Sequence, residues 1–369
     1  MRILFLNWKD VKNPDVGGAE IIAFEFARRL VKDAHEVIFF SRTFPGCRKQ
    51  EVLDGVSIIR RGNRLTVYLE AFLYYRSLKK KPDKVVDMIN TICWQTPLYI
   101  PEKKRVGYVN QLAKEVFFFE LSWPNSIISY IFEKFEYIAY RNTKMLCYSK
   151  STKDDLISFG IPEKNIKIFP MGMDHERYFP KGKKSVNPLF IFVARLVKMK
   201  RPDVCIKAME KVLLKYPRAK LAVIGSGPDE ERLKKITNNL KLTKNVVFVS
   251  KNNFFIDKNI KDIKLTLMRK AWALLLPSVK EGWGMVVTEA GACGTPAIVS
   301  NVTGLKDSVI NGKTGIILSK NPSSDELADA LIQIIEDEDL RKKLGKGAIR
   351  WSRRFSWEYS YVEFAKLIR

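Results

Sequence analysis

Apolar and polar residues follow two different periods along the chain. Short apolar runs alternate with longer segments in which apolar residues recur every three or four positions. The first pattern is typical of buried strands and the second of amphipathic helices. Residues 3–7 form the first apolar run, and Ile22, Phe26 and Leu30 then fall on one face of a helix predicted over 19–32. The pattern therefore predicts a strand followed by a helix.

The same alternation continues through two halves of the chain. In the first half, strands are predicted at 36–41, 56–61, 84–90, 105–111, 145–149 and 166–171, and helices at 65–80, at 125–140 and from Thr152. In the second half, strands are predicted at 189–194, 220–225, 246–250, 271–277 and 296–300, and helices at 202–215, 230–240, 286–293, 324–336, 338–353 and 357–368. Strands that alternate with helices indicate parallel sheets.

A polar stretch, 174–188, separates the two halves and lacks an apolar period. It reads as a linker. We expect an α/β protein of two Rossmann-like domains that face each other across a cleft. The expected first domain is 1–175, completed by 355–369 through a C-terminal helix that crosses back. The linker is then 176–187 and the second domain 188–354. Ligands bind at the carboxyl ends of such strands.

Composition narrows the class of protein. The chain has 369 residues, of which 46% are hydrophobic and 28% charged, which excludes a disordered chain and fits about two domains. Lys and Arg number 65 against 40 Asp and Glu, a net charge of +25. This excess favours an anionic partner: nucleic acid, an acidic membrane or a phosphorylated small molecule. Because no basic tail is present, a pocket in a basic surface fits better than a nucleic-acid arm.

Cysteine and histidine usage argues against metal and disulfide sites. Five cysteines lie far apart without a CxxC pair, and only His35 and His175 are present. We expect both histidines to be structural. The first apolar run is too short for a signal peptide, and no apolar stretch is long enough to span a bilayer. We therefore expect a cytoplasmic protein, either soluble or attached to the inner face of the cell membrane only at its surface.

The densest chemical signal is the segment EGWGMVVTEAGACGTP, which begins at Glu281. Gly282 and Gly284 let backbone N–H groups approach an anion, and the N-terminus of the following helix adds partial positive charge. Glu289 lies about one turn into that helix, where its carboxylate can accept hydrogen bonds from a ribose diol. Glu281 can face a sugar hydroxyl. Taken alone, however, this spacing fits a generic strand–loop–helix with solvated glutamates better than it fits a binding site.

Three other segments place cations or glycines after strands. Arg195 and Lys200 flank a strand-to-helix turn, where two cations can clamp a diphosphate, although two solvated surface charges fit equally well. Gly225 lies in the turn IGSGPD, and Gly17 and Gly18 follow the first strand. Each glycine turn alone is a weak signal for a phosphate loop.

In this order, the segments resemble the retaining glycosyltransferases of family 4 (glycosyl transferases group 1), which have the GT-B fold. The resemblance covers nearly the whole chain and is strongest over 192–318. The segments IFPMGMD at 168–174, SNVTG at 300–304 and NGKTG at 311–315 also look like the family.

The resemblance implies a donor site and a set of catalytic residues. The implied donor-binding positions are Gly17, Gly18, Arg195, Lys200, Gly225, Gly284, Met285, Val286 and Glu289. The implied catalytic positions are Glu281, Arg195, Lys200 and Asn110. The implied reaction moves a hexose from a nucleotide diphosphate sugar to a hydroxyl of a sugar, glycan or lipid-linked acceptor, with retention through front-face attack. Two cations and a helix N-terminus would stabilise the leaving diphosphate, so we expect neither a metal nor another cofactor.

Two positions depart from the family pattern. Asn110 stands where members often carry a histidine, and an amide cannot take a proton at neutral pH. Thr303 stands where the family usually has the first of two glycines, and a β-branched residue restricts the backbone there. The first departure leaves three alternatives: a dispensable histidine, a different sugar preference or impaired activity.

The segment 117–140 is unusually rich in aromatic residues and has two interpretations. It is either a core helix beside the acceptor side of the cleft, or a segment at an anionic membrane surface.

Two other classes of protein compete with the glycosyltransferase. A nucleotide-sugar epimerase shares the fold, but the first half is poor in acid and base side chains for it. A nucleic-acid-binding protein would explain the charge, but the chain lacks the signatures of such proteins.

Overall fold

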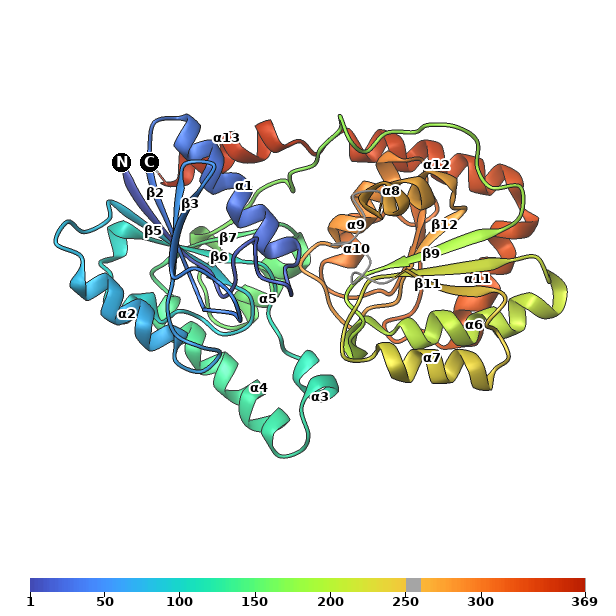
Figure 1. The fold of residues 1–369 in the computed structure, drawn as a ribbon, viewed down its shortest axis with the longest axis horizontal. Helices are drawn as coiled ribbons and strands as arrows, with labels where there is room; N and C mark the ends of the chain where they lie inside the picture. The colour runs from blue at the N-terminus through green and yellow to red at the C-terminus, as the bar shows by residue number, and fades with distance from the viewer. Residues whose placement is uncertain (250–259, 369) are drawn as a thin grey trace. The chain divides into compact units, whose positions relative to one another are not determined.

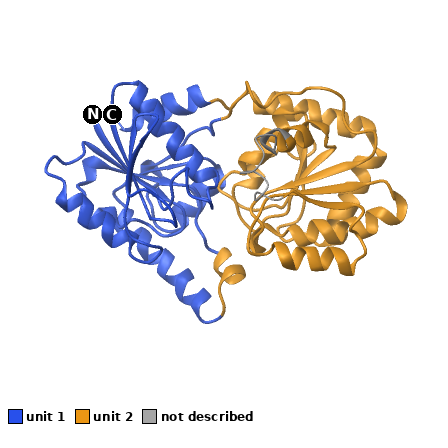
Figure 2. Ribbon diagram, in the orientation of Figure 1, with its two compact units in different colours: residues 1–114, 123–172, 357–369 blue, residues 115–122, 173–356 orange. Residues whose placement is uncertain are grey.

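The computed structural model describes residues 1–249 and 260–368, which form two compact units (Figures 1 and 2). Unit 1 comprises residues 1–114, 123–172 and the C-terminal segment from Trp357 onward. Unit 2 comprises residues 115–122 and 173–356. Each unit has its own sheet and its own apolar core.

An eight-stranded sheet in the order β3-β4-β2-β1-β5-β6-β7-β8 forms the centre of unit 1. All neighbouring strands are parallel except β3 and β4. The strands are β1 (Arg2–Leu6), β2 (Glu36–Ser41), β3 (Gln50–Leu53), β4 (Val56–Arg60), β5 (Lys84–Ile89), β6 (Arg105–Val109), β7 (Lys144–Cys147) and β8 (Ile166–Ile168). The main helices are α1 (Gly18–Lys32), α2 (Val67–Ser77), α4 (Asn125–Glu136), α5 (Lys150–Ser158) and α13 (Trp357–Ile368).

Helices cover both faces of this sheet, which explains why the strands are apolar on both sides. Along β1, Leu4 and Leu6 join a buried cluster with residues of α2. Phe5 points to the opposite face and packs against Phe39 and against Phe364 of α13. Figure 1 shows α1 and α13 on one side of the sheet and α2 on the other. The short apolar runs of the sequence thus correspond to strands buried on two faces.

The C-terminal helix α13 is part of the core of unit 1, as expected. The ring of Phe364 stacks on that of Phe26 in α1, with centroids 4.5 Å apart, and Trp357 meets Phe26 edge-on at 6.0 Å. Gly172 lies under the Trp357 ring, where a Cβ atom would be 2.0 Å from Cε3. The close contact between chain segments far apart in sequence therefore requires a glycine at this position.

A six-stranded parallel sheet in the order β11-β10-β9-β12-β13-β14 forms the centre of unit 2. Its strands are β9 (Leu189–Val193), β10 (Lys220–Ile224), β11 (Val246–Val249), β12 (Ala273–Leu276), β13 (Ala297–Val299) and β14 (Gly315–Ile317). Its helices are α3 (Val116–Glu120), α6 (Pro202–Lys215), α7 (Glu230–Asn239), α8 (Ile260–Lys270), α9 (Met285–Ala292), α10 (Leu305–Ser308), α11 (Ser324–Glu336) and α12 (Glu338–Ser352). Ser250, the last residue of the strand predicted at 246–250, lies outside the described residues.

The two-sheet α/β fold agrees with the sequence prediction, but some elements were not predicted. The edge strand β3 carries polar residues and is only partly buried, so it lacks an apolar run. Strand β14 has only three residues, and α8, with the sequence IKDIKLTLMRK, mixes charged and apolar residues. Neither pattern is distinctive enough to predict the element.

Helix α4 buries both of its glutamates against the rest of unit 1 and exposes its isoleucine and phenylalanine side chains. Its buried residues are Ser126, Glu133 and Glu136. The Glu133 carboxylate accepts hydrogen bonds from the backbone N–H groups of Ala113 and Lys114 at 2.5 and 2.7 Å. Glu136 accepts one from the Gln95 amide at 2.7 Å. This orientation contradicts the interpretation of α4 as a core helix that buries its apolar stripe.

Phe364 offers a test of how α13 contributes to unit 1. Because its ring is fully buried against Phe26, we expect Phe364→Ala to lower the free energy of unfolding by about 3–5 kcal/mol. Val362→Ala, on an exposed position of the same helix, is the control and should change it by under about 1 kcal/mol. Urea unfolding followed by circular dichroism measures both. Equal effects would show that α13 does not pack as described.

The buried carboxyl group of Glu136 predicts a dependence of stability on pH. Burial, together with the charge of Glu133, raises its pKa from 4.5 to about 8. Between these values the unfolded chain releases the proton that the folded chain retains, so this contribution to stability falls as pH rises. We expect Glu136→Gln to gain stability relative to the parent protein from about pH 5 to about pH 8. Urea unfolding at both pH values is the measurement.

The control for this titration is Glu210→Gln, at an exposed position of α6. Because this side chain is exposed, the substitution should change the free energy of unfolding by less than about 0.5 kcal/mol at either pH. If Glu136→Gln also shows a constant difference, Glu136 is not the buried acid that the structure describes.

Candidate active site

The loops that carry most of the predicted site residues follow neighbouring parallel strands of unit 2. Arg195 follows β9, Gly225 follows β10, and Glu281 follows β12. The carboxyl ends of parallel strands lie along one edge of a sheet. Unit 2 therefore brings these three predicted segments to a single edge of its sheet.

Lys200 and Glu281 form a largely buried ion pair at this edge. The Lys200 Nζ atom lies 2.5 Å from Glu281 Oε1, and the Ser278 hydroxyl donates a hydrogen bond to the same oxygen at 3.0 Å. Lys200 as a whole is 9% exposed. The interpretation of Lys200 as a solvated surface charge is therefore wrong. Ser278 was not predicted, although it lies just before the motif that begins at Glu281.

Lys280 is a second buried lysine beside this pair. It is 1% exposed, and its Nζ atom lies 3.6 Å from Glu115 Oε2. The backbone N–H of Val279 donates to the Met199 carbonyl at 2.8 Å, which ties the loop after β12 to the turn that carries Lys200. The two lysines are thus held by loops that are bonded to each other.

The loop 303–304 supports the backbone at Glu281. The Glu281 N–H donates to the Thr303 carbonyl at 3.2 Å. Gly304 has a φ of +82°, and a Cβ atom there would lie 2.2 Å from the Glu281 carbonyl oxygen. Thr303 is not among the described residues with positive φ. The left-handed conformation thus falls on Gly304, and the β-branched residue at 303 is accommodated.

Gly225 contacts protein backbone, which gives a structural reason for the glycine. Its φ is +149°, and a Cβ atom would lie 1.9 Å from the Ala194 carbonyl oxygen. The Leu196 N–H donates to the Ser226 carbonyl at 2.9 Å. These contacts fix the loop that carries Arg195. The Arg195 side chain is exposed and makes no hydrogen bond or ion pair within residues 1–249 and 260–368.

Glu289 is paired with a lysine that the sequence did not point to. Lys264 of α8 places Nζ 2.7 Å from Glu289 Oε2 and 3.4 Å from the Tyr178 hydroxyl. Burial of the Lys264 ammonium lowers its pKa, but the interactions with Glu289 and Tyr178 have the larger effect, so the pKa is raised overall. Lys264 precedes Glu289 by 25 residues on an unpredicted helix, so no local spacing signalled the pair.

The first turn of α9 presents the remaining predicted donor positions. Gly284 lies before the helix with a φ of +86°, and a Cβ atom there would be 2.7 Å from Leu305 Cδ2. Met285 and Val286 are half-buried and begin the helix, where backbone N–H groups lack intrahelical partners. This end of α9 can therefore donate hydrogen bonds to an anion.

In unit 1, the backbone of the glycine loop is bonded to the carboxylate of Glu20, in the first turn of the helix that follows. The Gly17 N–H donates to Glu20 Oε2 at 2.6 Å, and Lys9 Nζ lies 3.7 Å from Glu20 Oε1. Gly18 is exposed at the first position of α1. The observed contacts make Gly17 an N-terminal cap. Both glycines belong to unit 1, whereas Arg195, Lys200, Glu281 and Glu289 belong to unit 2.

Three asparagines follow three adjacent strands of unit 1. Asn7 follows β1, Asn90 follows β5, and Asn110 follows β6. The Asn90 amide donates to Asn7 Oδ1 at 3.1 Å. Asn110 is 8% exposed, and within the described chain its Nδ2 atom is buried without a hydrogen-bond partner. The sequence pointed to Asn110 alone, although each asparagine lies at or next to the C-terminal end of a predicted strand.

Both histidines make contacts that fit structural roles. The N-terminal amine lies 3.2 Å from His35 Nδ1, and His175 Nε2 lies 2.7 Å from the Phe355 carbonyl oxygen.

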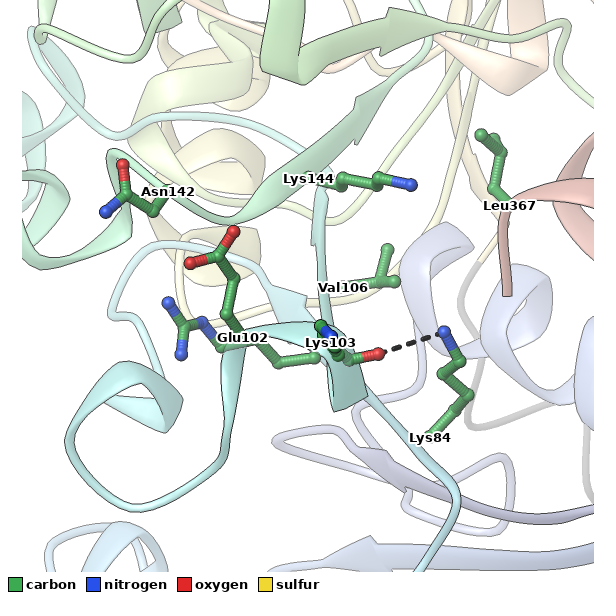
Figure 3. Close-up of a pocket in the computed structure, with 8 residues that line it drawn as sticks. Lys84, Glu102, Lys103, Val106, Asn142, Lys144 and Leu367 are labelled. Atoms are coloured by element: carbon green, nitrogen blue, oxygen red, sulfur yellow. Dashed lines mark hydrogen bonds between the residues drawn. The ribbon is translucent and has the colours of Figure 1, made fainter. Parts of the chain in front are cut away.

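Unit 1 has a cavity of about 250 Å³ (Figure 3). Its walls include Lys84, Arg105 and Lys144, which begin β5, β6 and β7. It therefore lies at the amino ends of the strands, opposite Asn110. The Lys84 ammonium donates to the Lys103 carbonyl at 3.0 Å. None of the predicted site residues lines this cavity.

Comparison with known proteins assigns the chain to a family. The sequence model of the glycosyl transferases group 1 matches residues 174–351, and that of glycosyltransferase family 4 matches residues 16–177. The chain therefore belongs to the group 1 glycosyltransferases, as the motifs predicted. An uncharacterized glycosyltransferase of Methanocaldococcus jannaschii is 31% identical over 232 residues, which cover 61% of this chain and 58% of that protein.

Solved structures show the same fold. Sucrose-phosphate synthase of Thermosynechococcus elongatus superposes with a TM-score of 0.79 and 20% identity, over 99% of this chain and 98% of the other. Anabaena HepE, solved in complex with UDP-glucose, superposes with a TM-score of 0.73 and 17% identity, over 100% of this chain and 99% of the other. Alignments with three curated relatives cover 58%, 51% and 47% of their lengths, so the chain spans about half of these proteins.

The support of Glu281 by Gly304 can be tested by adding a methyl group. Gly304 and Gly312 both have positive φ, but a Cβ atom at Gly312 meets nothing within 4 Å. We expect Gly304→Ala to lower the free energy of unfolding by about 1–3 kcal/mol more than Gly312→Ala, because only the first displaces backbone. Urea unfolding compares the two variants. Equal losses would mean that the contact with Glu281 does not constrain the loop.

Proposed function

We propose that the protein is a retaining glycosyltransferase that moves a hexose from a nucleotide diphosphate sugar to a hydroxyl of a sugar, glycan or lipid-linked acceptor. The observation that carries the proposal is the buried Lys200–Glu281 pair, which lies at the same edge of unit 2 as Arg195. A cation held in place before the reaction stabilises developing negative charge better than one that must reorganise.

Each residue of the edge has a role in this proposal. Lys200 and Arg195 interact with the diphosphate, whose negative charge grows as the bond between the anomeric carbon and the phosphate oxygen breaks. The N-terminus of α9 adds partial positive charge. Glu281 accepts a hydrogen bond from the transferred sugar. With these groups supplying the charge stabilisation, we expect turnover in the presence of EDTA.

Glu289 suits the ribose of the donor. Lys264 binds Oε2, and among the described residues Oε1 has no hydrogen-bond partner. A carboxylate held by one oxygen can accept hydrogen bonds from two neighbouring hydroxyl groups. The complex of HepE with UDP-glucose supports a nucleotide sugar as donor here.

The configuration at the anomeric carbon is retained because the acceptor oxygen attacks the same face of the sugar that the diphosphate leaves. The bond from the anomeric carbon to the phosphate oxygen breaks, a bond to the acceptor oxygen forms on the same face, and the acceptor proton passes to the leaving phosphate. This route needs no side-chain base, which suits the amide at Asn110. Asn110 then positions a hydroxyl group through its unpartnered Nδ2 atom.

The decisive variants are Lys200→Ala and Glu289→Gln. We expect Lys200→Ala to lower kcat/KM by roughly a hundredfold or more, because it removes a buried cation at the leaving group. Glu289→Gln should weaken donor binding roughly tenfold, because it removes a charged acceptor. A thermal-shift screen first identifies the donor, since a donor at about 100 times its Kd adds about 2.7 kcal/mol of stability. Release of nucleoside diphosphate measures turnover.

Lys198→Ala is the matched control, because Lys198 lies in the same turn as Lys200 but is exposed. It should keep near-parental activity. Full activity of both test variants with a proven donor would refute the site. Inversion at the anomeric carbon, read by NMR of the product, would refute retention. Conversion of the donor without an acceptor would favour the epimerase.

A further inference from the structure

The outward face of α4 is a feature of unit 1 that the proposed reaction does not use. It consists of Ile127, Ile128, Ile131, Phe132 and Phe135, preceded by Trp123, and we call these six residues the α4 face. Their exposed fractions run from 39% for Ile127 to 77% for Trp123. Folded monomers rarely expose so many large apolar side chains in one place.

The α4 face is a continuous stripe. Residues 127, 128, 131, 132 and 135 recur with the spacing of one side of a helix. The opposite side is fixed to unit 1 by Glu133 and Glu136, whose carboxylates accept the hydrogen bonds from Ala113, Lys114 and Gln95. Rotating the helix to bury the stripe would break these bonds. The apolar side is therefore held outward by the fold.

The charges around the stripe favour an anionic occupant. Of the three charged residues of α4, Glu133 and Glu136 are buried and only Lys134 is exposed. Arg141, which is also exposed, follows shortly after the helix. Within residues 125–141, the acidic groups are thus withdrawn from the surface and the basic groups remain on it. A second copy of this chain would bring another net charge of +25 against these cations, which opposes self-association.

We propose that the α4 face binds the surface of a lipid bilayer that contains anionic lipids. The isoleucine and phenylalanine side chains enter the boundary between headgroups and acyl chains, and Trp123 lies at the level of the headgroups. Lys134 and Arg141 interact with lipid phosphates. The helix lies in the plane of the interface. Among the residues that the structure describes, no helix is long and apolar enough to cross a bilayer.

Co-sedimentation with vesicles tests this proposal without reference to enzymatic activity, so its outcome is independent of the proposed function. The probes are vesicles of phosphatidylcholine alone and of phosphatidylcholine with an equal part of phosphatidylglycerol. We expect the full chain to bind the anionic vesicles more tightly and to be released by salt. Phe132→Ser with Phe135→Ser should weaken binding roughly tenfold for each side chain removed.

Two further variants make the test specific. Lys134→Glu should weaken binding to the anionic vesicles and leave any binding to phosphatidylcholine unchanged. Leu214→Ser, at an 86% exposed apolar position of α6, is the matched control and should bind as the parent does. Circular dichroism and urea unfolding establish that each variant is folded.

Two outcomes would overturn the proposal. One is equal vesicle binding by the parent and the folded Phe132→Ser, Phe135→Ser variant. The other is absence of vesicle binding together with a dimer in sedimentation velocity that the double variant loses, because the α4 face would then be an interface between copies of the chain.

Discussion

Burial of the Lys200 ammonium is the constraint on which the carboxyl edge of unit 2 depends. Removing a cation from water costs several kcal/mol unless an anion and hydrogen bonds compensate. Glu281 supplies the anion, and Ser278 fixes the carboxylate oxygen that Lys200 contacts. The loop that carries these two residues must therefore follow one backbone path.

Glycines make that path possible. Gly304 allows its loop to approach the Glu281 carbonyl, and Gly225 allows the turn after β10 to approach Ala194. In both places the nearest atoms to an added Cβ would be backbone, which cannot move aside as a flexible side chain can. The glycines thus act on the site indirectly, by fixing the loops that hold Arg195, Lys200 and Glu281. Fixed cations are what a developing diphosphate charge requires.

The fold was predictable because both sheets are buried on two faces, so most strands appear as apolar runs. The edge strand β3 escaped prediction because it is polar, and β14 because it is short and begins with a glycine, which is uncommon in strands. The motifs placed Glu281 and Glu289 after the strand predicted at 271–277, which is β12 in the structure. They did not predict that Lys200 is buried, since an isolated lysine in a basic chain usually lies in solvent. Lys264 could not be found from spacing, because its contact with Glu289 depends on tertiary structure.

Helix α4 shows a different limit of sequence patterns. Periodicity identifies an apolar stripe but not the direction in which it points, and the usual assumption directs it to the core. Here the direction is decided by polar groups. Backbone N–H groups of Ala113 and Lys114 need acceptors, and Glu133 provides both. A helix with two inward carboxylates has to leave its apolar residues outside.

The two sheets share an architecture but differ in the chemistry at their carboxyl ends. In unit 2 that edge carries charged groups, Arg195 and the Lys200–Glu281 pair. In unit 1 the strands β1, β5 and β6 are followed by the neutral amides of Asn7, Asn90 and Asn110. A diphosphate requires fixed positive charge, whereas a polyhydroxylated acceptor requires groups that both donate and accept hydrogen bonds, which amides do without titrating. In the reaction proposed above, the acceptor would meet an Asn110 Nδ2 atom that is already buried and without a partner among the described residues, so acceptor binding would not have to remove water from that amide.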